Sequence, residues 1–578
     1  MNSEINFVDE LEENIDIELP DGKTIDGELK ISSDRFPSID SGSYFLKRSD
    51  LLPSKKNGLG FIKCASKKNI YHCYGDEIWM NIFNPKYIVQ IDHDATFSGI
   101  EVALTGVSAW LNDGLGCTCL ENEVSKKFPT NKIYEKITIN EQKFIVTSEH
   151  YYSTKTEGTI TTIKEYQTIK IVKQNGSLTL KELDNLACDI KIIFSLLLVG
   201  ELSFKSIKLI EANTSKSFPF YFLELSSKKE PFSSNRYCFT SASELFNNNC
   251  WKGIFHGYFC RKNKYNRENI WPRIVNMFSY DGFWEYDILG VVSILDAYSQ
   301  KIYGRKKYIN FTECPEIKAK LEPIIEKLKN DSSHDKAALE LLDRISETIK
   351  ETKRDVTLTD RVQNYFSTLD ESIIKILNFT DDEFDLIKKV RNCAAHGSVI
   401  NDKLKGKIQI VFSVRDKILI FLIYSAYIEL GFAPLDFYNF LKKTMNKIKN
   451  SLDINTYELD KVTDSAKFIG LDKVEFEKFK NKSSGKMITI NLACEYLKEN
   501  SNYIYNNYIN DSLLPKRYLN HNDRRFPTIE SYLSNAMESF DKYELEVIPK
   551  AYLEYGDEHI EIHYLVLISL KGEQPNGK

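Results

Sequence analysis

The sequence lacks the cysteine patterns that mark several classes of protein. Its 11 cysteines never occur as Cys-x-x-Cys, which argues against a zinc ribbon and against a dithiol redox pair. An odd, irregularly spaced set of cysteines is typical of proteins in a reducing compartment. The chain also has no internal repeat and no low-complexity tract. A reduced, non-repetitive globular protein is therefore expected.

A basic excess and a long apolar segment are also missing. The 82 acidic and 77 basic residues leave a formal net charge of -5, so any site for a polyanion must be local. The N-terminal stretch MNSEINFVDELEEN has no basic region followed by an apolar core, so we expect no signal peptide. The most apolar run, residues 192–199, is too short to span a bilayer. These features predict a cytoplasmic protein with no membrane partner.

The first 235 residues are predicted to form a β-rich domain, because apolar and polar residues alternate between turn signals. A hairpin is expected around Pro20-Asp21-Gly22. Thr179 and Glu182 have the spacing of a capping box and precede an apolar helix over 180–198. Further strands are expected at 87–92, 99–106, 136–139, 143–148, 168–173, 207–212 and 221–225.

Residues 236–282 form an aromatic and basic segment that we interpret as a linker. It contains four residues of the types that bind zinc, namely Cys238, Cys250, His256 and Cys260. Their spacings of eleven, five and three intervening residues fit no common zinc finger, so buried cysteines in an aromatic cluster are the preferred interpretation. No metal and no other cofactor is predicted.

From 283 to 450 the apolar period becomes helical, which predicts a helical bundle. Helices are expected over 283–304, 315–331, 334–352, 359–369, 381–397, 414–431 and 434–451. Residues 451–578 are predicted to be a small mixed domain of unknown role, with strands at 551–555 and 559–570 after a linker at 481–486. The expected fold class is therefore α+β.

The stretch RNCAAHG, residues 391–397, contains the candidate catalytic residues. Arg391 falls four residues after Ile387 and so extends the apolar face of its helix, where an arginine needs a specific partner or an interface. His396 is four residues after Asn392 and projects from the same side, next to a helix-ending glycine. A purely structural reading stays open, in which Arg391 pairs with a carboxylate of the bundle and His396 caps the helix through its dipole.

A second Arg/His pair lies downstream, at Arg517 and His521 in the basic run KRYLNHNDRR, with only three residues between them. We interpret that run as a solvated or phosphate-facing surface, with a solvated surface as the preferred interpretation.

A helical bundle that contains Arg-Asn-x-x-x-His resembles the HEPN superfamily (higher eukaryotes and prokaryotes nucleotide-binding), whose motif is Arg, four to six residues, then His, often with a polar residue after the Arg. Arg391, Asn392 and His396 match all three positions. The order of a β-rich domain followed by the bundle, and the stretch GIEVALTGVSAWLNDG, resemble the ApeA-like abortive-infection proteins of phage defence. The resemblance covers about 15–450, and the domain after 450 departs from the family.

The resemblance implies a metal-independent endoribonuclease that cleaves host RNA, with tRNA as the expected substrate, and leaves a 2′,3′-cyclic phosphate. Histidine can accept or donate a proton near neutral pH, and arginine stays charged and can hold phosphate oxygens. Asn392 would orient the histidine or the phosphate. The β-rich domain would then sense a phage-derived activator.

The chain contains a single such motif, whereas acid and base roles are most easily divided between two histidines. Because HEPN nucleases pair two motif helices across a dimer, we expect a homodimer with a composite site. Asp296 could also point toward that site, although a solvated face or a salt bridge is the preferred interpretation. The alternative function is a non-catalytic HEPN-like module that binds RNA or nucleotide, or assembles a complex.

Overall fold

The structure is a computed structural model of the 578-residue chain. It describes residues 7, 10–18, 23–32, 35–42, 55–56, 59–75, 77–79, 81–112, 117–120, 123–126, 131–157, 160–224, 232–303, 306–308, 315–331, 335–350, 353–355, 357–398, 406–474, 476–477, 480, 495–499, 502–505 and 543–570. The expected linker at 481–486 and the basic run at 516–525 lie outside these residues.

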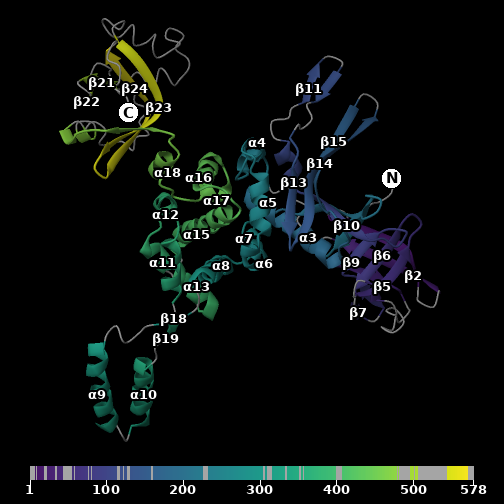
Figure 1. The fold of residues 1–578 in the computed structure, drawn as a ribbon, viewed down its shortest axis with the longest axis horizontal. Helices are drawn as coiled ribbons and strands as arrows, with labels where there is room; N and C mark the ends of the chain where they lie inside the picture. Colours follow the sequence, from purple (N-terminus) through teal and green to yellow (C-terminus); the bar gives the residue numbers. More distant parts are fainter. Residues whose placement is uncertain are drawn as a thin grey trace. The chain divides into compact units, whose positions relative to one another are not determined.

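The chain divides into two compact units, one with residues 1–369 and 379–452 and the other with 370–378 and 453–578. The first unit contains a large antiparallel sheet followed by helices, and the second contains a small sheet (Figure 1). The predicted α+β class, with a β-rich N-terminal region, is confirmed.

The large sheet has 15 strands in the described part of the chain, in the order β13-β14-β15-β10-β16-β17-β9-β6-β5-β1-β2-β3-β8-β7, with β4 pairing β5. These strands are β1 (Leu11–Glu18), β2 (Thr24–Ser32), β3 (Arg35–Asp40), β4 (Lys55–Lys56), β5 (Leu59–Ala65), β6 (Ile70–Gly75), β7 (Glu77–Trp79), β8 (Ile82–Asn84), β9 (Tyr87–Gln90), β10 (Phe97–Leu104), β13 (Tyr134–Ile139), β14 (Gln142–Glu157), β15 (Ile160–Lys173), β16 (Phe204–Glu211) and β17 (Ser217–Phe222). A separate hairpin consists of β11 (Cys117–Leu120) and β12 (Glu123–Lys126).

The register follows the alternation in the sequence. Strands β1 and β2 pair antiparallel from Leu11 opposite Ile31 to Glu18 opposite Thr24, as the predicted hairpin requires, and the turn itself lies outside the described residues. Along β1 the buried residues are Ile15 and Ile17, which share one face of the strand. The central strand β10 is buried over all 8 residues, between β15 and β16.

Helix α3 (Leu180–Leu198) packs against β10 and β16. The predicted capping box is present, since the Thr179 hydroxyl accepts from the Glu182 amide and the Glu182 carboxylate accepts from the Thr179 amide. Val199 adopts the left-handed conformation after the helix, although no glycine is present there. The helix therefore begins as the sequence predicts and ends at a left-handed residue that is not glycine.

Short helices follow over the aromatic and basic segment: η1 (Asn235–Tyr237), α4 (Ala242–Asn247), α5 (Trp251–Phe259), η2 (Arg261–Asn263), α6 (Lys264–Asn269) and α7 (Trp271–Asn276). They are connected to the sheet region by buried contacts. The indole nitrogen of Trp110, in α2 (Val107–Leu111), donates to the Thr240 carbonyl at 2.7 Å, and its ring meets Phe194 and Trp251 edge to face. The segment thus packs as part of the first unit.

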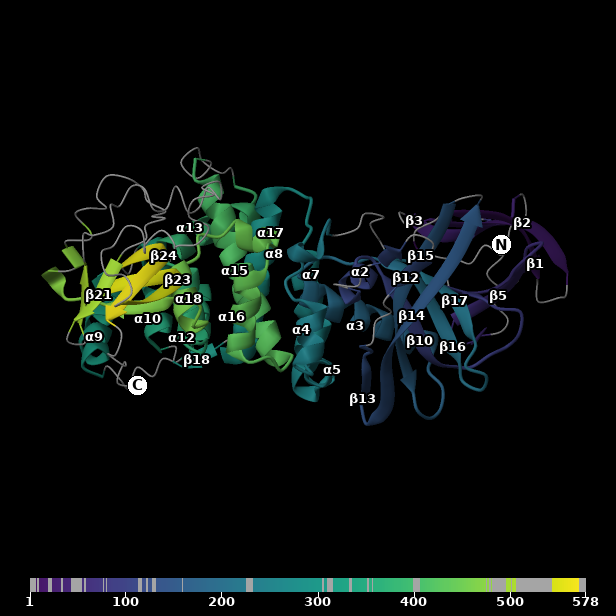
Figure 2. The same cartoon turned by 90° about the horizontal axis from the view of Figure 1, so that it is seen from above.

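The next helices form the bundle, and most begin where the sequence predicts. They are α8 (Trp284–Tyr303), α9 (Pro315–Asp331), α10 (Lys336–Lys350), α11 (Leu358–Phe366), α13 (Asp381–His396), α15 (Ile408–Glu429), α16 (Pro434–Lys443) and α17 (Lys447–Asn450). Strands β18 (Lys306–Tyr308) and β19 (Lys353–Asp355) pair at the base of the α9 and α10 hairpin. Figure 2 shows α15 running beside α8 and α16, against both of which it packs.

Two predicted boundaries in the bundle are wrong. Helix α15 begins at Ile408 rather than Val414. The helix expected over 434–451 breaks at Thr444–Asn446, because this turn is held by tertiary hydrogen bonds: the Thr444 hydroxyl donates to the Cys238 carbonyl at 2.9 Å, and the Asn446 amide donates to the Val199 carbonyl at 3.1 Å. The residues next to Thr444 and Asn446 in the sequence do not indicate these partners, which lie more than 200 positions away.

The second unit includes α12 (Glu371–Leu377) and α18 (Thr456–Val462), which pack together. Its five-stranded sheet has the order β20-β23-β24-β21-β22 within the described residues. The strands are β20 (Lys467–Gly470), β21 (Glu495–Glu499), β22 (Asn502–Tyr505), β23 (Tyr543–Tyr555) and β24 (Glu558–Leu570), and the last two include the strands predicted at 551–555 and 559–570.

Candidate active site

Helix α13 presents the RNCAAHG stretch at its C-terminal end, and its N-terminus is fixed by a capping box. The Thr380 hydroxyl accepts from the Glu383 amide at 3.2 Å, while the Glu383 carboxylate accepts from the Thr380 amide at 3.0 Å. Asp381, Asp382 and Glu383 place negative charge in the first turn, where the helix dipole favours it. Glu383 also pairs with the Lys417 ammonium of α15 at 2.8 Å. The helix is thus tied to its neighbour at its start.

The inner face of α13 consists of Phe384, Ile387 and Val390, all buried. These positions follow the three- and four-residue spacing of one helix face, and the helix packs against α8 and α15. Burial of three large side chains contributes on the order of 5 kcal/mol of transfer free energy. This packing fixes the rotation of the helix and so decides which way residues 391–396 point.

Arg391 lies at the border between this inner face and solvent. Its residue is partly buried, and its Nε atom is fully buried without a hydrogen-bond partner among the residues that the structure describes. One terminal nitrogen donates to the Asn392 side-chain oxygen at 3.0 Å. A buried guanidinium nitrogen without an acceptor costs free energy, so Arg391 is suited to gain an oxygen ligand.

Asn392 and His396 are exposed, one helical turn apart on the same face. In the described part of the chain His396 has no hydrogen bond or ion pair, so its ring is open to an incoming group. The helix ends immediately afterwards because Gly397 adopts φ 63°, a conformation that suits glycine, and the Ser398 amide donates to the Cys393 carbonyl at 2.9 Å. The proposed salt bridge of Arg391 to a bundle carboxylate is absent from the described residues.

The helix does not bring Arg391 and His396 together within one copy of the chain. Residues five positions apart are separated by about 140° around a helix axis, since each residue turns about 100°. Arg391 therefore lies toward the packed side and His396 toward solvent, in agreement with their burial. Arg391 and Asn392 are in contact, whereas His396 shares only the face of Asn392.

Asp296 does not join these residues. Its carboxylate accepts from Nε of Arg361 in α11 at 2.8 Å and pairs with a terminal nitrogen of the same guanidinium at 2.6 Å. The preferred interpretation, a salt bridge, is confirmed. It links α8 to α11, which are two helices of the bundle.

A buried ion cluster that the sequence analysis missed holds α15 against α8. Arg415 donates to the Asp287 carboxylate at 2.9 and 3.2 Å, to the Met277 carbonyl at 2.8 Å, and to the Asp416 carboxylate at 2.5 Å. Burial raises the pKa of Asp287, against the opposing effect of Arg415. The signal was present in the sequence, because Arg415, Asp416 and Lys417 interrupt an otherwise apolar helix.

The four residues considered for zinc lie in different surroundings. Cys238 is buried, Cys250 and Cys260 are partly buried, and His256 is exposed. Across the described residues, no group of three or more His, Cys, Asp or Glu side chains has a metal-binding arrangement.

Within the described ranges, no helix has both the length and the apolar content needed to cross a bilayer.

A family model described as Apea-like HEPN matches residues 289–434, which run from α8 through the motif helix α13 to the first residue of α16. No curated protein and no solved structure matches the chain. The matched segment contains Arg391, Asn392 and His396 within one continuous domain model. Residues 289–434 of the chain therefore match the Apea-like HEPN family.

Proposed function

We propose that this chain is a metal-independent HEPN endoribonuclease of anti-phage abortive infection, in which Arg391, Asn392 and His396 form the catalytic site. An HEPN domain of the ApeA type supports a ribonuclease-like role in defence. We propose host tRNA as the substrate and a 2′,3′-cyclic phosphate as the product. The observation that carries it is the partly buried Arg391, whose Nε lacks a partner among the described residues, beside the exposed Asn392 and His396.

The chemistry needs only groups that this helix end supplies. A base removes the proton of the ribose 2′-hydroxyl, the 2′-oxygen attacks phosphorus, the bond from phosphorus to the 5′-oxygen breaks, and the leaving 5′-oxygen receives a proton. His396 exchanges a proton with one of these oxygens, since imidazole does so near neutral pH. Arg391 donates to the non-bridging oxygens as negative charge grows there. Asn392, already bonded to Arg391, orients the guanidinium or the phosphate.

The proposal includes a homodimer, because one histidine cannot easily serve as base and as acid in the same event. The exposure of His396 and Asn392 leaves this face of α13 open to a second copy. Two facing helices would place two Arg391/His396 pairs around one phosphate. A monomer in light scattering at micromolar concentration would contradict the composite site.

The test is cleavage of total bacterial RNA by the purified chain in the presence of EDTA. We expect cleavage that survives the chelator and ends in 2′,3′-cyclic phosphate, identified by mass spectrometry of the fragments. Arg391→Ala and His396→Ala should each lower the rate by at least ~100-fold, the range for a lost proton-transfer group or charge-stabilising donor.

Two matched controls separate catalysis from loss of charge or of any histidine. Lys389→Ala removes an exposed cation from the same helix, and His256→Ala removes an exposed histidine from α5. Both should retain cleavage. Cleavage unchanged in Arg391→Ala and His396→Ala would contradict the proposal, as would phage protection in cells that persists without His396. Tight RNA binding with no cleavage, in cells that are being infected, would favour the binding module instead.

A further inference from the structure

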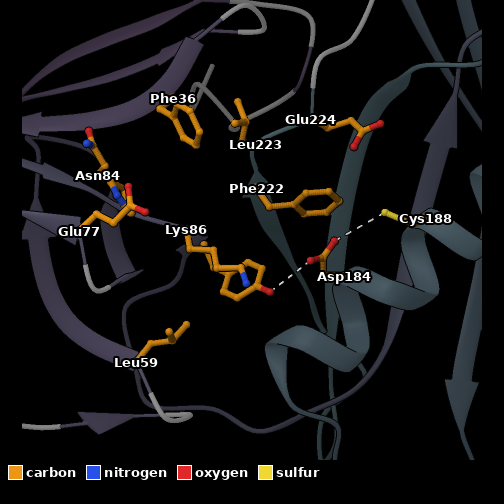
Figure 3. Close-up of a pocket in the computed structure, with 12 residues that line it drawn as sticks. Phe36, Leu59, Glu77, Asn84, Lys86, Asp184, Cys188, Phe222, Leu223 and Glu224 are labelled. Carbon is orange, nitrogen blue, oxygen red and sulfur yellow. Dashed lines mark hydrogen bonds between the residues drawn. The ribbon is translucent and has the colours of Figure 1, made fainter. Parts of the chain in front are cut away.

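A pocket of about 630 Å3 opens in the β-rich region, between the ends of β3, β7, β8 and β9 on one side and α3 and the end of β17 on the other. This volume suits a small molecule. Figure 3 shows Glu77 on one side of the pocket and Asp184 and Glu224 on the other. The pocket lies far along the chain from residues 391–396 and shares no residue with them.

Asp184 lines the pocket, and its carboxylate is held by two hydrogen bonds and by the longer-range attraction of the Lys86 ammonium. Its carboxylate accepts from the Tyr87 hydroxyl at 3.2 Å and from the Cys188 thiol at 3.7 Å, and both donors are neutral. No Lys or Arg forms an ion pair with it in the described part of the chain. Burial raises the pKa of Asp184, against the opposing effects of the Tyr87 and Cys188 hydrogen bonds and of the Lys86 ammonium. A cation brought by a ligand would relieve this cost of burial.

The other described charged side chains that line the pocket are two carboxylates and one ammonium group. Glu77 and Glu224 add two carboxylates, and Lys86 is the one cationic side chain among the lining residues that the structure describes. The Lys86 ammonium lies 5.2 Å from the centre of the Tyr87 ring, and Glu224 pairs with Lys191 of α3 at 2.5 Å. Because Lys191 neutralises Glu224, the Asp184 and Glu77 carboxylates remain against the Lys86 ammonium, and this excess of one negative charge among the described lining residues favours a positively charged guest over an anionic one.

Apolar and aromatic side chains form the rest of the wall. Phe222 is buried, whereas Phe36 is 62% exposed at the pocket and leaves one face of its ring available to a guest. Leu59 and Leu223 also line the space. A guest with an apolar body would bury these surfaces, and an ammonium group near aromatic faces gains a further attraction.

We propose that this pocket binds a small organic cation, an amine with an apolar or aromatic body, whose ammonium group donates to the Asp184 carboxylate. The body of the ligand lies against Phe36 and Phe222. This inference does not depend on the proposed nuclease, because it concerns a separate site and is measured without RNA. Either one can therefore fail while the other stands.

The experiment compares three probes that share one body: phenethylamine, the neutral 2-phenylethanol and the anionic 3-phenylpropanoate. Binding to the full-length chain is measured by saturation-transfer NMR and by the shift of the unfolding midpoint. We expect the amine to bind roughly five- to tenfold more tightly than the alcohol, the difference between a charge-assisted and a neutral hydrogen bond, and the carboxylate to bind least.

Three variants locate the site. Asp184→Asn keeps an acceptor for Tyr87 and Cys188 but removes the charge, so it should abolish the preference for the amine. Phe36→Ala should weaken the amine and the alcohol alike by a few fold, and it leaves the fold intact because Phe36 is largely exposed. Asp26→Asn removes an exposed carboxylate of β2 outside the pocket and should change nothing.

Binding of the amine that is lost in Asp184→Asn and kept in Asp26→Asn supports the proposal. Equal binding of amine and alcohol, an amine preference that survives Asp184→Asn, or binding unaffected by Phe36→Ala would each overturn it. The absence of binding by all three probes would overturn it as well.

Discussion

Two glycines of α5 provide a paired test of how this helix is packed against the central helix α15. Gly253 and Gly257 are one turn apart on α5, and both face the end of α15. A Cβ built on Gly257 would lie 2.6 Å from the Glu429 carbonyl oxygen and 2.8 Å from two backbone atoms of Leu430. Among the described residues, a Cβ on Gly253 would meet only the Leu430 carbonyl oxygen, at 3.9 Å. The same substitution therefore creates a backbone clash at one site and ordinary contact at the other.

The magnitudes follow from these distances. Glycine to alanine within a helix stabilises it by up to about 1 kcal/mol, and this gain is shared by both variants. Overpacking against backbone that cannot rotate away costs about 1–3 kcal/mol. Gly253→Ala should thus be neutral or stabilising, while Gly257→Ala should be less stable than Gly253→Ala by about 1–3 kcal/mol. The Asn263 amide, which donates to the Gly257 carbonyl at 2.9 Å and to the Glu429 carbonyl at 3.1 Å, would be displaced with the helix.

The assay is urea unfolding of the full chain followed by tryptophan fluorescence, to which Trp251 in α5 itself contributes. Both variants gain the same helix propensity from alanine. The difference between their unfolding midpoints therefore measures the cost of the steric clash at Gly257. Equal midpoints for the two alanine variants, or stabilisation by Gly257→Ala, would refute the close backbone approach of α5 to α15.

Two further predictions concern buried charge. Burial raises the pKa of Asp189 to about 6, while the Tyr258 hydroxyl donates to it at 2.8 Å. The folded chain therefore binds a proton more tightly than the unfolded one, so stability falls as pH rises from about 4 to 6, by about 3 kcal/mol at most from this group. In urea titrations the decline should be smaller in Asp189→Asn, where Asp184 and Asp287, whose pKa values burial also raises, still contribute to it. A decline of equal size in both proteins would contradict this prediction. Arg415→Met leaves Asp287 and Asp416 buried without their cation, so it should lower the free energy of unfolding by about 3–5 kcal/mol, less at acid pH where the carboxylates become neutral. A loss below about 1 kcal/mol at neutral pH would show that the cluster contributes little.

Sequence-based prediction succeeded for elements that short-range interactions stabilise and failed for elements that depend on residues distant in the sequence. The capping box of Thr179 and Glu182 was predicted and is present, because all of its atoms lie within four residues. The break between α16 and α17 was missed, because its hydrogen bonds join Thr444 and Asn446 to residues more than 200 positions away. At the candidate site, the position of Arg391 on the packed face was predicted from helical spacing, and its partly buried state agrees. The catalytic roles of Arg391, Asn392 and His396 remain predictions.

The sequence by itself determined the elements whose causes are local. Alternation placed the strands on either side of α3, helical spacing placed α13, and Gly397 ended it through a left-handed turn. The family of the helical domain also follows from sequence, since the match over 289–434 is a match of residues.

Only the tertiary structure decided which distant groups meet. Asp296 pairs with Arg361, 65 positions away in the sequence, and Tyr87 donates a hydrogen bond to Asp184, 97 positions away. Tyr87 and Asp184 both line the pocket, which the spacing of residues along the chain did not predict. The physical reason is that periodicity records which face of an element is buried, whereas an ion pair or a pocket depends on which buried faces are brought together.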